Sequence, residues 1–285
     1  SKKNIPLDEE CQILVDGIPA VTGYLDEISP SYSSSSHEVK FSGRSKTCDL
    51  MDCSAIIDAG QILGGSPKDI IQQVLQPFGI KLIFEADTAL KPIAEFQVQP
   101  GETAQSIIEK VCKQTGMMFT DNAEGALVIQ SIGMAASAGK LVHHVADGVG
   151  NNILSASAKF STRDVFRDYY VKSQMAGSDE LGGEDITGIE GKAIDSEVKR
   201  YRPLVLTAES SMDNSTAQTR AEWERSNRRG KAMSAQFTVY GWTNSSGDLW
   251  SPNSFITIDD DFIRLKGKLF VSAVRLSTEV LLRNR

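Results

Sequence analysis

Histidine, cysteine and clustered carboxylates are the residues of this chain that could support catalysis or bind a metal ion. The adjacent His143 and His144 lie far in sequence from any cysteine or serine with a supporting motif. The four cysteines match neither a CxxC pair nor a zinc-ribbon spacing: Cys11, Cys48, Cys53 and Cys112. We therefore expect no metal ligands, and we expect reduced, unpaired and mostly buried thiols in a protein assembled in a reducing cytoplasm.

Two acidic stretches could be read as cation sites. The stretch from Gly177 to Lys192 holds five glycines and five acidic residues, but it lacks the ordered Asp-x-Asp-x-Asp-Gly spacing of a calcium loop. We interpret it as a mobile acidic surface loop. In Asp259, Asp260 and Asp261, three consecutive carboxylates on a strand would point to alternate faces, which favours a solvated hairpin turn.

No enzyme signature is present in the sequence. A Gly-x-Ser-x-Gly elbow is absent, and the glycine-rich run Gly60-Gln-Ile-Leu-Gly-Gly-Ser lacks the lysine of a phosphate-binding loop. We predict that the protein is not an enzyme, with no catalytic, cofactor-binding or metal-binding residue and no cofactor. A lysozyme-type carboxylate pair cannot be recognised in one sequence, so a cell-wall hydrolase stays an alternative. Three tryptophans are expected in the core, although they could stack on bases or sugars: Trp223, Trp242 and Trp250.

The bulk composition indicates a soluble protein of two or three modest domains. Hydrophobic residues make up 40% and charged residues 24% of the 285 residues. The apolar runs are short and interrupted by charge, as in Ile80 to Phe84, so we expect no membrane insertion. The net charge of −7 argues against stable nucleic-acid binding through a basic surface.

The elements that would position any site begin with β structure. Strands are predicted for Cys11 to Val15, Pro19 to Ile28 and His37 to Phe41, with a turn at Asp16-Gly17. Three short strands rarely close a core alone, so we expect further strands before Ser1. Residues 1–64 are thus predicted to be an incomplete N-terminal β-barrel.

Residues 65–133 are predicted to be a small α/β domain. One helix begins at Ser66-Pro67 and ends before Gly79, and a second begins at Thr103 and ends before Gly116. Each is followed by an apolar, strand-like run. The similar segments starting at Asp69 and Ser106 are 37 residues apart, which fits either an internal duplication or two unrelated αβ units.

Residues 134–285 are predicted to form a second β-barrel domain with an inserted or packed helix–strand segment. A small-residue linker is expected from Met134 to Gly139, followed by a strand pair, Ile153 to Phe160 and Val165 to Gln174. A helix from Ser215 to Arg229 places Glu224 and Arg228 for an i,i+4 pair, with cations in its last turn. The last predicted strands are Ala235 to Trp242, Phe255 to Ile258 and Lys268 to Arg275.

Beyond these elements, the sequence resembles the tail proteins of phage Mu and its prophage relatives, a baseplate hub family. The resemblance begins with the run from Gly23 to Tyr32 and continues through His37 to Ala55. Further matches follow in order: Pro100 to Thr103, Asp121 to Ile129, Asn152 to Ala158, Arg200 to Leu204, Ala221 to Glu224 and Gly241-Trp242. These matches extend over nearly the whole chain. It departs from the family before Ser1 and after Arg285, where more strands and an apolar ending are expected.

The resemblance implies an α+β, multidomain fold with barrel-like antiparallel β domains plus small α/β domains. It implies a structural hub subunit of a contractile tail, similar to other tail hubs and to the base of type VI secretion spikes. Such a homotrimer would join the tail tube to the membrane-piercing spike protein and let DNA pass. The expected partners are other copies of the chain, the spike and tube or other baseplate proteins. The expected location is the virion tail baseplate, after assembly in the host cytoplasm.

Two further expectations accompany this interpretation. The strand from Ile153 to Phe160 carries Leu154 and Phe160 on one face and could pack between subunits. The acidic stretches 177–192 and 259–261 are candidates for an acidic channel wall that does not retain DNA. The alternative is a cell-envelope secretion or receptor module, because the unit from Ile93 to Ile132 resembles small secretin domains.

Overall fold

The computed structural model describes residues 6–57, 60–85, 90–131, 135–146, 148–173, 189–208 and 212–278. It divides into two compact units, and the second is made of two separate stretches of chain, Gly133–Thr162 and Lys231–Arg285. Unit 1 contains Ser1–Ile132 together with Arg163–Gly230, which is inserted between the two stretches of unit 2. The predicted division into 1–64, 65–133 and 134–285 stays a prediction.

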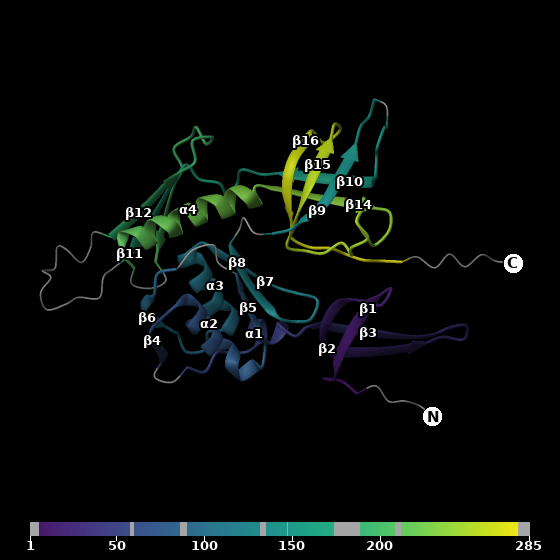
Figure 1. Cartoon of the computed structure of the whole chain (residues 1–285), viewed down its shortest axis with the longest axis horizontal. Helices are drawn as coiled ribbons and strands as arrows, with labels where there is room; N and C mark the ends of the chain where they lie inside the picture. The colour runs from purple at the N-terminus through teal and green to yellow at the C-terminus, as the bar shows by residue number, and fades with distance from the viewer. Residues whose placement is uncertain are drawn as a thin grey trace, which may run out of the picture. The chain divides into compact units, whose positions relative to one another are not determined.

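The N-terminal sheet is antiparallel, with strand order β1-β2-β3. Its strands are β1 (Glu10–Val15), β2 (Ile18–Tyr32) and β3 (His37–Ser45), and the predicted turn at Asp16-Gly17 joins the first two with both residues at positive φ. Strand β1 pairs only with β2 residues up to Tyr24, so the far part of β2 and β3 is a two-stranded ribbon (Figure 1). Both faces of β3 are exposed, so its alternating pattern does not mark a buried face.

The α/β part of unit 1 contains two helices that begin and end where the sequence predicts. Ser66 and Asp69 form a capping box at α2, and the Thr103 side chain accepts a hydrogen bond from the Ser106 amide at α3. Gly79 and Gly116 close the two helical segments in the left-handed conformation. The elements are α1 (Cys48–Asp52), β4 (Gln61–Gly65), α2 (Pro67–Leu75), a 3-10 turn (Gln76–Phe78), β5 (Leu82–Glu85), β6 (Ile93–Gln97), α3 (Ala104–Thr115), β7 (Met117–Asp121) and β8 (Leu127–Ser131).

A strand–helix–strand order occurs twice in this part of the chain, as β4-α2-β5 and β6-α3-β7. The first strands of the two units, β4 and β6, pair with each other. Their last strands, β5 and β7, lie on either side of β8. Both helices bury their apolar stripes in one core, with Ile70, Val74, Ile107 and Val111 at most 2% exposed. The arrangement agrees with the 37-residue sequence spacing.

The inserted segment is a three-stranded sheet with α4 (Asn214–Lys231) packed on one face (Figure 1). Its strands are β11 (Asp168–Ser173), β12 (Ile189–Ile194) and β13 (Pro203–Thr207), in the order β12-β11-β13. Tyr169 and Val171 pack against Ala217 and Ala221 of the helix. The predicted pairing of Ile153–Phe160 with the following strand is wrong, because β11 pairs with β12 and β13.

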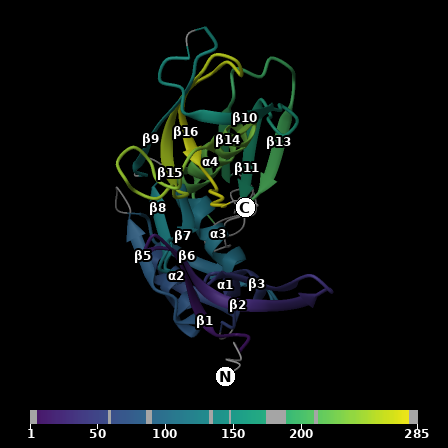
Figure 2. The same cartoon turned by 90° about the vertical axis from the view of Figure 1, so that its right-hand side faces the viewer.

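Unit 2 contains two sheets that share one apolar cluster. Strands β9 (Ser137–His143), β15 (Ser254–Asp260) and β16 (Leu265–Val271) form one sheet, and β10 (Ile153–Phe160) pairs with β14 (Met233–Val239) in the other (Figure 2). Leu141, Ile256 and Ile258 pack against residues of both sheets. The predicted linker is wrong for Ser137 to Gly139, since these residues belong to β9 and run parallel to β15.

Candidate assembly surfaces

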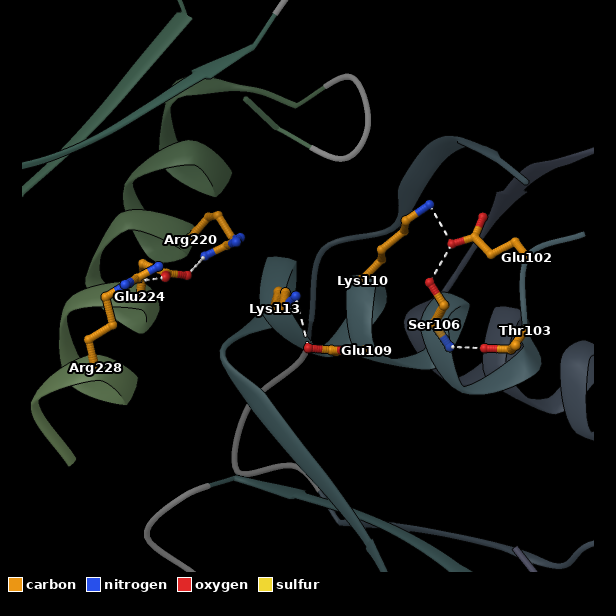
Figure 3. Close-up of polar contacts among 9 residues, drawn as sticks. All are labelled: Glu102, Thr103, Ser106, Glu109, Lys110, Lys113, Arg220, Glu224 and Arg228. Atoms are coloured by element: carbon orange, nitrogen blue, oxygen red, sulfur yellow. Dashed lines mark hydrogen bonds and ion pairs between the residues drawn. The ribbon is translucent and has the colours of Figure 1, made fainter. Parts of the chain in front are cut away.

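A buried ion-pair ladder runs along α4 in unit 1 (Figure 3). Arg220 Nη1 lies 2.7 Å from Glu224 Oε2, and Arg228 Nε lies 2.5 Å from Glu224 Oε1. The predicted Glu224–Arg228 pair is therefore confirmed, and Arg220 is a third member that the sequence analysis missed. Burial alone would raise the pKa of Glu224, but the hydrogen bonds from both arginines outweigh it and lower that pKa. One carboxylate thus joins two arginines of the same helix, and the ladder keeps a net charge of +1.

The cations in the last turns of α4 contact neighbouring loops of the same unit. Arg228 Nη1 donates to the Asp164 carbonyl at 3.3 Å, and its guanidinium lies 5.3 Å from the Phe166 ring centroid. Arg229 pairs with Asp195 and Glu197. These contacts attach the helix end to the loop before β11 and to the loop between β12 and β13, in addition to the dipole effect that the sequence predicts.

The start of α3 carries a second polar cluster (Figure 3). Glu102 accepts hydrogen bonds from the Ser106 hydroxyl at 2.7 Å and the Gln99 amide at 3.1 Å, and Lys110 Nζ lies 2.5 Å from its Oε1. Desolvation would raise the pKa of Glu102, but these donors lower it. The cluster holds the turn from Pro100 to Thr103 against the first turns of α3.

The structure brings the two histidines to the three consecutive aspartates. His144 Nε2 and Asp259 Oδ2 are 3.7 Å apart, and with Asp261 their possible ligand atoms lie within 4.8 Å of one another. The Asp259 carboxylate already faces two ammonium groups, Lys266 at 3.3 Å and Lys140 at 3.5 Å, and the hydrogen bond from Lys266 lowers its pKa. Two cations at the same carboxylate make an ion-pair cluster the better description of this geometry than a metal centre.

The turn after β15 is partly different from the sequence prediction. Asp260 is buried, at 4% exposure, and its Oδ1 accepts the amides of Phe262 and Ile263 at 2.9 and 3.0 Å. The prediction of a hairpin turn is confirmed by the pairing of β15 with β16, but "solvated" is wrong for this residue. The Asp260 carboxylate is buried because it accepts the backbone amides of the turn that follows it.

Two other sequence expectations have mixed outcomes. Residues 174–188, most of the predicted acidic loop from Gly177 to Lys192, lie outside the described residues, and Ile189 to Lys192 belong to β12. The three tryptophans are intermediate in burial, which corrects the expectation of core residues. Trp250 packs against the unit 2 cluster, Trp223 stacks on Arg220, and the Trp242 indole donates to the Ser277 carbonyl.

Exposed apolar side chains concentrate on β-sheets. On the N-terminal sheet, Ile13 is 59% and Phe41 52% exposed, and on β10 the predicted outward residues Leu154 and Phe160 are 65% and 61% exposed. Sheet surfaces of this kind in a folded protein mark sites of contact with other molecules. Among the described residues, no helix is long and apolar enough to cross a membrane.

Comparison with known proteins identifies the family of the chain. Residues 47–131 match the family model of the second domain of gp44-like baseplate hub proteins, and residues 213–281 match the fourth domain of the Mu phage baseplate assembly protein GpP. The chain is 30% identical over 269 residues to the baseplate hub protein gp44 of Escherichia phage Mu, covering 92% of this chain and 69% of that protein. The chain belongs to the Mu-like baseplate hub family.

Solved structures support the same assignment. The 43 kDa tail protein of prophage MuSo2 from Shewanella oneidensis is 32% identical, with a TM-score of 0.78 over 93% of this chain and 78% of that chain. The tail protein of Neisseria meningitidis MC58 has the same fold, with a TM-score of 0.76 at 21% identity over 93% of this chain and 77% of that chain. As a member of the hub family, this α+β protein is a structural tail component, and the alternative of an envelope secretion module is set aside.

Proposed function

We propose that this hub subunit acts as a homotrimer whose β domains form a ring between the tail tube and the membrane-piercing spike of a contractile tail. The observation that supports the ring most directly is the exposure of apolar residues on β10 and on the N-terminal sheet of a hub-family chain. A closed ring would cover such faces with identical neighbours. The proposed location is the tail baseplate, after assembly in the host cytoplasm.

The channel of this ring would let DNA pass without retaining it. Three copies with a net charge of −7 each give a strongly acidic assembly, about −21 in total. Because each phosphate contact adds affinity through counterion release, an acidic wall would keep the polymer moving. Within 259–261, Asp261 is exposed and is a proposed contributor to that wall, whereas Asp259 is paired with two lysines and Asp260 is buried. Most of the stretch 177–192 lies outside the described residues, and its contribution stays a prediction.

The role is proposed to be structural and not enzymatic. Three of the carboxylates in these clusters are already engaged: Asp259 by lysines, Asp260 by backbone amides and Glu224 by arginines. Purified protein should leave peptidoglycan intact in zymograms. Clearing that disappears when one carboxylate is replaced would contradict the structural role.

Light scattering coupled to gel filtration tests the trimer. The expected mass is three times 31.0 kDa, and duplex DNA should show no binding near physiological salt. A stable dimer, or tight DNA binding, would count against the proposed ring and channel.

A further inference from the structure

The sheet of β11, β12 and β13 has one covered face and one open face. Side chains that point toward α4 are buried, while the alternate residues on the other side are accessible. The open face is apolar at Val205, 59% exposed, and Ile194, 49% exposed, and Tyr201 in the loop that leads into β13 is 82% exposed. Tyr170 lies at its centre, between Lys192 and Val205 in the strand register. An apolar sheet face of this kind requires a partner.

Lysines and carboxylates balance on the strands of this open face, and the loop that leads into β13 makes its edge cationic. Lys172 and Lys192 lie on it, and Lys192 Nζ sits 5.1 Å from the Tyr170 ring centroid. The loop that leads into β13 adds Lys199 and Arg200. Among the described residues, Asp168 and Glu190 balance the two lysines on the strands. The acids of the loop, Asp195 and Glu197, are already paired with Arg229, so the loop cations are in excess. The fitting partner is therefore acidic and apolar.

The hairpin of β1 and the first part of β2 has that complementary chemistry. Six carboxylates lie between residues 8 and 27, and there is no lysine or arginine from residue 6 to residue 36. Glu10 and Asp26 are paired with Lys46 and Arg44 of the same copy, which leaves four carboxylates in excess. Ile13 and Val21 stand directly opposite each other and are 59% and 39% exposed. The neighbouring Thr22 is buried and donates to the Ala123 carbonyl, so the opposite face of the hairpin is attached to the α/β part.

We propose that the open face of β11–β13 binds the acidic β1–β2 hairpin of a second copy of this chain. The proposal rests on the homo-oligomer proposed above and assigns one of its contacts. Face and hairpin both belong to unit 1, so every copy carries both halves of a head-to-tail contact. Such heterologous contacts generate rings when the rotation closes. The apolar residues supply burial, and the opposite charges fix orientation and the choice of partner.

Photocrosslinking of the full chain tests this contact. Tyr201 is replaced by p-benzoylphenylalanine, and the same replacement at Tyr240, 89% exposed in unit 2, is the matched control. Mixing isotope-labelled and unlabelled copies distinguishes crosslinks between copies from those within one copy. Trypsin should release the hairpin as a single peptide, Asn4 to Lys40, because no cleavage site lies between. We expect Tyr201 to capture this peptide from the other copy and Tyr240 not to.

A charge exchange gives an independent measurement. K172E/K192E should weaken self-association at least tenfold, and E9K/E27K on the hairpin should do the same. Combining the two pairs should restore most of the affinity. K68E/K81E, which reverses two exposed lysines elsewhere in unit 1, is the control and should leave association unchanged.

The outcomes separate this inference from the proposed ring. If the protein forms trimers but Tyr201 captures no hairpin peptide and the combined variant shows no recovery, the contact is wrong while the trimer stands. A chain that stays monomeric at all concentrations overturns both. Capture of nucleic acid or of a different protein by Tyr201, without the hairpin, also overturns the contact.

Discussion

Removing the central carboxylate of the α4 ladder should destabilise unit 1 strongly. Glu224→Ala leaves the Arg220 side chain, only 5% exposed, without its 2.7 Å carboxylate partner. Breaking a buried pair by removing one member typically costs about 3–5 kcal/mol. The Arg228 side chain is 27% exposed and can be hydrated, so the loss of its ion pair with Glu224 should cost less stability. We therefore expect a loss near the lower end, about 3 kcal/mol.

Urea unfolding followed by tryptophan fluorescence measures this loss, because Trp223 lies on the same helix and stacks on Arg220. Replacing Trp242 and Trp250 by phenylalanine restricts the signal to unit 1. Glu222→Ala, an exposed carboxylate on α4, is the matched control and should change stability by less than about 0.5 kcal/mol. The triple variant R220M/E224L/R228M should recover most of the loss, since apolar residues of similar volume often replace buried ion networks without cost.

The pH dependence of unfolding tests whether the ionised Glu224 carboxylate stabilises the folded state. The folded-state pKa of Glu224 lies below its ordinary value of 4.5. The contribution of Glu224 to the free energy of unfolding should therefore be fully present above pH 4.5 and be lost as the pH falls through the lower pKa of the folded state. Glu224→Ala should flatten this acid-side loss. The reasoning is refuted if Glu224→Ala costs no more than Glu222→Ala, or if both variants keep the wild-type acid profile.

Two further predictions concern packing and the thiols. Gly191→Ala would place a Cβ 2.0 Å from the Ala217 carbonyl oxygen and should destabilise unit 1 by several kcal/mol in the same urea assay. Gly230→Ala, with open space around it, is the control and should be neutral or slightly stabilising. Equal effects would show that β12 and α4 do not approach closely. In the native protein, two exposed thiols should react quickly with an aromatic disulfide reagent and two buried thiols slowly, because burial raises the pKa of Cys112 to about 12. Denaturation without reductant should make four thiols reactive. Two or fewer would reveal a disulfide among the four cysteines, Cys11, Cys48, Cys53 and Cys112.

Local features of the fold could be predicted because they depend on neighbouring residues. Ser66-Pro67 and Gly116 mark helix ends by capping and left-handed geometry, and both act where expected. Glu224 and Arg228 are one helical turn apart, so their contact follows from spacing alone. Strand pairing between residues distant in sequence was not predicted correctly. Strand β10 pairs with β14, more than 70 residues away, and the sequence of β10 alone does not specify this partner.

The candidate surfaces could be only partly predicted for the same reason. Sequence alternation places Leu154 and Phe160 of β10 on one face, and both are exposed, although the strand is exposed on its other face as well. The open face of the β11–β13 sheet, which carries Val205, was not predicted, because β13 is apolar on both faces and only the position of α4 decides which one is covered. Likewise, Asp260 appeared solvated because the two amides that its carboxylate binds follow it in a turn that the sequence does not display.

The inserted topology of unit 2 implies that residues 163–230 are removable. Phe160 is paired with Met233, and the Ser161 amide donates to the Ala232 carbonyl at 2.7 Å, so the two points where the chain leaves and re-enters the unit are already held together. A short connector between these points would turn β10 and β14 into an ordinary hairpin and unit 2 into an uninterrupted chain. The same site would accept a foreign domain whose termini lie close together, which makes unit 2 a natural scaffold for grafting.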